Sequence, residues 1–491
     1  MTISDLTYAT AAQLAAALAA GEVSSVELTD AAIARIERLD AAINAVCVRD
    51  FERAREAARQ ADTARARGTD GKIGALLGIP MLIKESFNIA GLPTTWGIPP
   101  FKDFIPAEDA LAVSRVKAAG AVILGKTNVP LALADLQSYN GIYGATKNPW
   151  DAGRTPGGSS GGSAAALAAG YAALSIGSDI AGSLRVPAHF CGIYAHKPTY
   201  GVVPSRGHAP PMAPAIPYER DLSVVGPMAR SAGDLLSLFE LLAEPDPMAS
   251  GQAYRLALPK PRHQALRDFR VLLIDNHPAI PTSASIRSVF DDVARKLESA
   301  GVKVKRESPL LPDQFEAARV YMRLLLSTVS ASYPPELYEQ MRVQAAKLGA
   351  GDRSLAAERL RGSVLSHRDW VAADSARAQL RHRWRALFAE FDIVLCPASP
   401  TSAFPHDQSP NQWAREILID GEEHDYPDQL VWAGIASAPG LPATVLPVAR
   451  DRNNLPIGMQ LVGPMYEDLT TLHFARLLET ELGGFVPPPL S

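Results

Sequence analysis

Residues 154–176 read RTPGGSSGGSAAALAAGYAALSI, a loop of small residues that leads into an alanine-rich stretch and then into an apolar run. Alanine is the strongest helix former, so a helix is expected directly after the loop. The run 172–176 is short, apolar and close to glycines, which predicts a buried strand. A helix followed by a buried strand is a repeating unit of α/β folds.

Similar short apolar runs recur along the chain and alternate with longer stretches of helical character. Because Gly and Pro flank these runs and polar residues do not alternate within them, they predict strands that are covered on both faces. The predicted fold class is therefore α/β. The further runs lie at 78–83, 121–124, 271–274, 393–395 and 443–446, and amphipathic helices are expected at 286–300 and 370–390.

The first 67 residues differ from the rest because they look helical throughout. Residues 24–27 have a capping-box pattern, after which Val26, Ile33 and Ile36 mark one helical face. Prolines recur between 245 and 265 without periodicity, which predicts a surface connection. Since strands are expected on both sides of that connection, one continuous sheet and two domains are both compatible with the pattern.

Composition narrows the class of protein. The chain has 491 residues, of which 47% are hydrophobic and 20% charged, so it is expected to fold around a large core. A net charge of −4 without blocks of like charge argues against nucleic acid as a partner. We find neither a signal-peptide pattern nor an apolar run long enough to span a bilayer, so a cytoplasmic protein with no membrane partner is expected.

The three cysteines, Cys47, Cys191 and Cys396, are an odd number spread widely along the chain. This spacing predicts neither a disulfide framework nor a Cys-x-x-Cys metal site. A reducing compartment is consistent with them, and no metal site is expected.

The glycine–serine loop at the start of the quoted stretch is compatible with several kinds of site. The glycines at 157 and 162 have P-loop spacing, but Ser163 stands where that motif has lysine. A dinucleotide fingerprint needs a preceding strand, and residues 150–156 do not predict one. A helix cap by Ser160 or Ser163, with no catalytic role, is a further alternative.

A nucleophile elbow is the closest catalytic alternative for this loop. Residues 157–161 satisfy Gly-x-Ser-x-Gly, which would make Ser159 the nucleophile of a Ser-His-Asp hydrolase. His189 and His196 are candidate bases by position alone. The motif also requires a strand directly before it, and the residues there do not resemble one.

Two other places carry chemistry. Residues 177–188 follow a predicted strand, and Ser183 ends a series of small residues whose backbone N–H groups could converge as an oxyanion hole. Lys84 directly follows the apolar run of another strand, where burial would disfavour its charged form. Each feature also has an ordinary structural explanation when taken alone.

Together these motifs resemble the amidase signature family. The resemblance rests on GIPMLIKESFN at 78–88, PGGSSGGSAAA at 156–166, GSDIAGSLRVPA at 177–188 and HKPTYG at 196–201. Further matching stretches, in order over nearly the whole chain, are GKTN at 125–128, VGPMAR at 225–230, LCPASPT at 395–401 and PIGMQLVG at 456–463.

The resemblance implies the amidase signature fold, a large mixed and mostly parallel central β-sheet covered by helices on both faces. It implies one catalytic domain over residues 68–491, with a signature core at about 73–235 and the C-terminal part of the sheet at about 265–491. Residues 1–67 would be an N-terminal helical segment that packs on this core.

For the site, the resemblance implies a Ser–cis-Ser–Lys triad with Ser183 as nucleophile, Ser159 as bridging serine and Lys84 as base. Gly158 would precede the cis peptide, and Asp179 and Arg185 would brace the turn. A lysine base must be neutral, so the pKa of Lys84 has to lie about 2–3 units below its reference value. The implied oxyanion donors are the N–H groups of Ile180, Ala181, Gly182 and Ser183; Ala181 stands where the family pattern has Gly, so its methyl would conflict with a positive φ or trim the pocket.

The implied function is an amidohydrolase that cleaves the C–N bond of a linear amide or carbamate through an acyl-enzyme, without a cofactor. Aromatic and apolar loops favour small uncharged or aryl substrates, as for an aryl acylamidase or urethanase. A glutamine-hydrolysing subunit of a tRNA-dependent amidotransferase is the alternative within the family. A monomer or homodimer is expected, and the predicted substrate-binding residues are Tyr139, Asn140, Gly141, Ile142, Met212 and Trp432.

Overall fold

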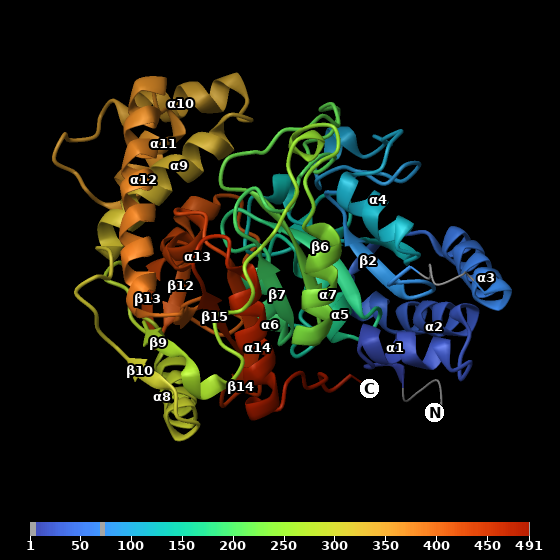
Figure 1. The fold of residues 1–491 in the computed structure, drawn as a ribbon. Coiled ribbons are helices and arrows are strands. Elements are labelled where there is room, and N and C mark those ends of the chain that lie inside the picture. The colour runs from blue at the N-terminus through green and yellow to red at the C-terminus, as the bar shows by residue number, and fades with distance from the viewer. Residues whose placement is uncertain (1–5, 69–73, 491) are drawn as a thin grey trace.

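The computed structural model describes residues 6–68 and 74–490, and an eleven-stranded sheet lies at its centre (Figure 1). All six apolar runs noted in the sequence are strands of this sheet, as predicted. In spatial order the strands are β1 (Val46–Arg49), β3 (Val122–Thr127), β2 (Pro80–Lys84), β6 (Leu174–Asp179), β8 (Val224–Ala229), β7 (Tyr194–Lys197), β14 (Ala443–Arg450), β15 (Pro456–Val462), β11 (Ile393–Pro397), β9 (Arg270–Leu273) and β10 (Lys303–Lys305).

The sheet is mixed, as expected, with parallel pairing in two groups. Strands β3, β2 and β6 form one parallel group, and β11, β9 and β10 form the other. Between them, β6, β8, β7, β14, β15 and β11 pair antiparallel, so the centre is more antiparallel than the sequence predicts. The short turn from β14 to β15 explains part of this difference, because a tight connection can only join antiparallel neighbours.

Helices cover both faces of the sheet, which confirms the predicted α/β architecture. One face packs against α1 (Ala11–Ala19), α4 (Leu111–Ala118), α7 (Ala232–Leu242), α8 (Ala284–Ser299) and α14 (Asp468–Leu482). The other packs against α2 (Ser25–Ile43), α3 (Phe51–Arg67), α5 (Gly161–Ala168), α6 (Arg185–Cys191), α9 (Gln314–Ser330), α12 (His367–Glu390) and α13 (Leu430–Ser437).

The two ends of the molecule carry different helices. In Figure 1, α10 (Pro335–Ala345) and α11 (Leu355–Ser363) gather with α9 and α12 at the upper left, while α1 to α3 lie at the right. The cap of α2 is the predicted capping box, with the Ser24 side chain accepting from the Glu27 backbone N–H. Among the described residues, no helix combines the length and apolarity needed to cross a membrane.

The N-terminal segment packs on the core through its helices and also adds a strand. Strand β1 pairs antiparallel with β3 at the sheet edge, a contribution that the helical pattern of this region did not predict. Strand β8 precedes the proline-rich connection in the sequence and β9 follows it, and both belong to the same sheet. Of the two alternatives left open by the sequence, one continuous sheet is the one observed. The predicted boundaries at residues 1, 73 and 491 lie outside the described residues, and the 67/68 boundary stays a prediction.

Candidate active site

Strand β2 ends at Lys84, whose side chain is fully buried. Its Nζ donates to Ser159 Oγ at 2.7 Å and to Ser178 Oγ at 2.9 Å. Burial lowers the pKa of Lys84 to about 7, although the negative charge of Asp179 acts in the opposite direction. Near neutral pH a large share of this amine is therefore uncharged and able to accept a proton.

Ser159 lies in the glycine–serine loop just before α5, and the Gly158–Ser159 peptide is cis, as the resemblance implies. A Cβ on Gly158 would lie 2.5 Å from Asp135 O, so only glycine fits at this position. The Ser160 side chain does not cap α5 and donates instead to Ser178 O at 3.3 Å. Ser163 Oγ does not cap the helix either, because it is bonded to the buried hydroxyls of Thr127 and Ser175. The structure therefore does not support the helix-cap alternative.

Ser183 lies in the turn between β6 and α6 and is 4% exposed. The Ser160 N–H donates to Ser183 O at 3.1 Å, which joins this turn to the glycine–serine loop. Within the part of the chain that the structure describes, no hydrogen bond joins Ser159 Oγ to Ser183 Oγ. The bridging hydroxyl and the candidate nucleophile thus lie on two adjoining loops, and the lysine contacts the first of these loops from the end of β2.

The backbone donors near Ser183 differ in one respect from the expectation. The Gly182 N–H already donates to Asp179 Oδ1 at 2.9 Å. In residues 6–68 and 74–490 the N–H groups of Ile180, Ala181 and Ser183 have no hydrogen-bond acceptor and are free to meet an oxyanion. Gly182 has a φ of 98° and Ala181 is not in the positive-φ region, so the Ala181 methyl causes no backbone conflict.

Asp179 and Arg185 brace this turn, which is the structural role expected of them. Arg185 Nη2 donates to Asp179 Oδ1 at 2.8 Å and Arg185 Nε to Oδ2 at 3.0 Å, with both side chains buried. Despite the burial, the arginine holds the pKa of Asp179 at about 2. Arg185 also donates to Gln460 Oε1 and Ser437 Oγ, so the turn is tied to β15 and α13.

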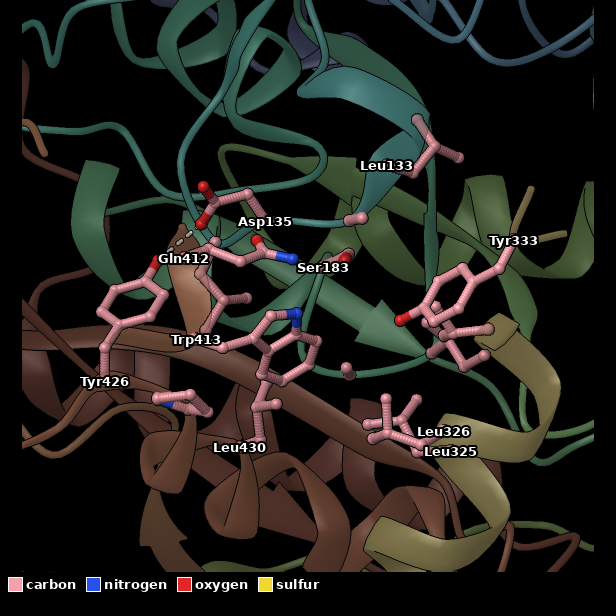
Figure 2. A pocket seen from close by; sticks show the side chains of 16 residues that line it. Leu133, Asp135, Ser183, Leu325, Leu326, Tyr333, Gln412, Trp413, Tyr426 and Leu430 are labelled. Atoms are coloured by element: carbon pink, nitrogen blue, oxygen red, sulfur yellow. Dashed lines mark hydrogen bonds between the residues drawn. The ribbon is translucent and has the colours of Figure 1, made fainter. Parts of the chain in front are cut away.

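A cavity of about 130 Å³ opens beside Ser183 (Figure 2). Its wall is mostly apolar, and among the described residues that line it Asp135 has the one carboxyl group. Ala181 is one of the residues that line the cavity, and the idea that its methyl trims the pocket stays a prediction. The wall is made of Leu133, Ala134, Asp135, Leu136, Ile180, Ala181, Ser183, Leu325, Leu326, Val329, Tyr333, Gln412, Trp413, Tyr426, Pro427 and Leu430.

None of the six predicted substrate-binding residues belongs to this wall. Trp432 is fully buried against His277, and Met212 is 72% exposed on a loop. Tyr139 accepts from Arg415 through its hydroxyl, and Asn140 donates to Val129 O. Gly141 and Ile142 follow them in the same turn. The sequence did not point to Trp413, Tyr333 or the leucines of α9, because nothing local distinguishes them from packing residues.

The alternative that uses a histidine base is not supported by the geometry. His189 bonds to Thr401 O at 2.9 Å and to the Gly458 backbone, and His196 bonds to Asp468 at 3.1 Å. Both rings are buried in these contacts, whereas Ser159 Oγ is bonded to Lys84. Among the described residues, no group of three or more His, Cys, Asp or Glu side chains could hold a metal ion.

A protein-family model described as Amidase matches residues 27–472. The chain belongs to the amidase signature family. It is 31% identical to a subunit of the glutamyl-tRNA(Gln) amidotransferase of Moorella thermoacetica, with 97% of each chain covered. Among solved structures, it is similar to a chain of a vestigial protein complex linked to the origins of an s-triazine catabolic enzyme (29% identity, 97% and 99% covered, TM-score 0.80). A bacterial aryl acylamidase of the amidase signature family shares the fold (22% identity, 96% of each chain, TM-score 0.80).

Proposed function

We propose that this amidase signature protein hydrolyses the C–N bond of small uncharged amides or carbamates, with Ser183 as the nucleophile. The observation that carries the proposal is the 2.7 Å contact between the buried Lys84 amine and Ser159 Oγ. An alcohol is a poor nucleophile until a base takes its proton, and a lysine with a pKa of about 7 can act as that base.

In the proposed reaction, neutral Lys84 takes the proton of Ser159 as Ser159 takes the proton of Ser183. Ser183 Oγ then attacks the substrate carbonyl, and the N–H groups of Ile180, Ala181 and Ser183 stabilise the oxyanion. The lysine ammonium returns its proton through Ser159 to the leaving amine as the C–N bond breaks. Water then attacks the acyl-enzyme by the same relay and frees Ser183.

The wall of the cavity supports an uncharged substrate. The carboxyl of Asp135 is already bonded to Arg415 and to the Tyr426 hydroxyl, so it does not offer a free charge to a ligand. The remaining wall is dominated by leucines, valine, alanines and aromatic rings. Such a pocket holds apolar groups through burial and would leave an ammonium or carboxylate without a partner.

A glutamine-hydrolysing subunit that works with partner proteins is a second candidate. It is supported by the similarity to the glutamyl-tRNA(Gln) amidotransferase chain over 97% of both sequences. Glutamine carries both an ammonium and a carboxylate, and the described residues of the cavity beside Ser183 offer no free charge to either. On this account the chain would need its partners to become active on glutamine.

The nucleophile is tested by labelling with a fluorophosphonate and mapping the adduct by mass spectrometry. We expect the adduct on Ser183, and its absence in Ser183→Ala; an adduct on Ser159 would overturn the mechanism. For the substrate, acetanilide, a phenyl carbamate and glutamine are compared with the purified chain. No turnover of any of the three by the purified chain, with ammonia released from glutamine once amidotransferase partner subunits are added, would favour the second candidate.

A further inference from the structure

Residues 404–429 leave the central sheet after β11 and cover one side of the cavity. They contain the hairpin of β12 (Glu416–Ile419) and β13 (Glu422–Asp425), and Trp413 lies just ahead of it. The Trp413 side chain lines the cavity and remains 42% exposed. In the view of Figure 2, its indole and the Tyr333 phenol lie on either side of Ser183.

Two buried side chains from the facing loop hold this segment in place. Gln137 Nε2 donates to Asp407 O at 2.8 Å, and Gln137 Oε1 accepts from the Asp407 N–H at 2.9 Å. Asp135 accepts from Arg415 Nη1 at 2.6 Å and from the Tyr426 hydroxyl at 2.7 Å. The segment is therefore attached to the same loop that supplies one wall of the cavity.

Arg415 is the central contact of this attachment and follows Trp413 by two residues. Its side chain is 1% exposed and also donates to the Tyr139 hydroxyl at 2.6 Å and to Ser409 O at 3.2 Å. A guanidinium has five donors in one rigid plane, so several bonds at once leave it a single orientation. With Arg415 immobilised, the backbone at Trp413 cannot move far from the cavity.

We infer that Trp413 makes this enzyme favour aryl over alkyl amides, and that Arg415 is a positioning residue for it. The inference rests on the proposed function and names the substrate class of the same site. An indole presents a flat π-face that an aromatic ring contacts better than a flexible alkyl chain of similar area. The leucines of α9 on the facing wall offer apolar contact to both, so discrimination falls to the aromatic rings of the wall, of which the indole of Trp413 has the largest face.

The test compares two substrates that share an acetyl group, acetanilide and N-butylacetamide. Trp413→Ala is expected to lower the ratio of their kcat/KM values about tenfold, and Trp413→Phe to retain most of it. Tyr338→Ala is the matched control, because Tyr338 is an aromatic residue of α10 with 40% exposure that does not line the cavity. An unchanged ratio in Trp413→Ala would overturn the inference.

Binding to Ser183→Ala separates this inference from the proposed function. In that background, calorimetry should show acetanilide bound about tenfold more weakly when Trp413→Ala is added, with a much smaller loss for N-butylacetamide. If the added Trp413→Ala removes the preference for binding acetanilide, the role of Trp413 is supported even when the turnover experiments contradict the proposed mechanism. If Ser183→Ala and the double variant bind acetanilide equally well, the inference is overturned. Arg415→Lys should lower the ratio of the kcat/KM values for acetanilide and N-butylacetamide. Thermal unfolding checks its fold, and the Trp413 series decides if that variant does not fold.

Discussion

Asp179 and Arg185 form a buried ion pair six residues apart, and the turn between them presents Ser183. The carboxylate of Asp179 also accepts from the N–H groups of Gly182 and Leu184, so each of its oxygens has two donors. One side chain thus shapes the backbone on which the proposed oxyanion donors lie. The arginine in turn anchors that backbone to β15 and α13.

Replacing Arg185 by Met is expected to destabilise the fold by about 3–5 kcal/mol, because it leaves a buried carboxylate without its countercharge. Activity should fall together with stability, since the turn would lose its shape. Urea unfolding followed by circular dichroism measures the first effect, and initial rates the second. Arg59→Met, which breaks an exposed pair with Glu56, is the control and should change stability by less than about 1 kcal/mol.

The pH dependence of kcat/KM should follow the ionisation of Lys84. Since its pKa is about 7 and the neutral amine is the reactive form, the rate should rise with pH through about 7 and level off above it. Lys84→Arg keeps a permanent positive charge and should lose at least about a thousandfold of activity. A rate that falls as pH rises from 6 to 8 would contradict the assignment of Lys84 as base.

Burial of Lys84 should also cost stability. Its pKa falls from 10.5 to about 7 on folding, so between these values the unfolded chain binds a proton that the folded chain does not. The unfolding free energy contributed by this group therefore increases with pH. Lys84→Met is expected to stabilise the protein at pH 7 by roughly 2–4 kcal/mol, with a gain that shrinks towards pH 10. Thermal unfolding across pH measures this, and Lys117→Met at the surface should show no such trend.

Ser178 is expected to tune the lysine without taking part in the relay. Its hydroxyl accepts from Lys84 Nζ at 2.9 Å, a bond that favours the charged amine. Ser178→Ala should therefore move the acid limb of the pH–rate profile to lower pH and reduce kcat by about tenfold at most. Ser175→Ala, on the same strand but bonded to Ser163, is the control and should leave the limb where it is.

Ala181 should limit the size of substrates. Ala181 lines the cavity and its backbone has no positive φ, so a larger side chain there would add bulk without backbone strain. Ala181→Val is expected to lower kcat/KM for acetanilide by about tenfold or more, whereas Ala181→Gly should accept bulkier acyl groups. A series of anilides with acetyl, butyryl and benzoyl groups provides the measurement.

The prediction of strands from sequence worked best where burial on both faces makes a short run wholly apolar, as in β2 and β11. It did not find β7, β8 or β15, which are buried throughout but contain Gly, Pro or polar residues. It also did not find β10, because a strand with exposed lysines at both ends has no such run. Strand β1 was missed for a similar reason, since it lies at the sheet edge and its last residue is exposed.

Lys84, Ser159 and Ser183 are predicted from motifs alone, because each lies in a stretch whose residue types and order resemble a known family. Only the folded chain shows that Lys84 is enclosed enough to lower its pKa, that Ser178 is its second partner, and that Asp179 occupies the Gly182 N–H. Burial and hydrogen-bond competition depend on neighbours that are distant in sequence. The walls of the cavity also depend on the tertiary structure. Leu133, Tyr333 and Trp413 belong to segments that meet only when the sheet and its helical layers assemble. No local sequence pattern could therefore have predicted that they line one cavity.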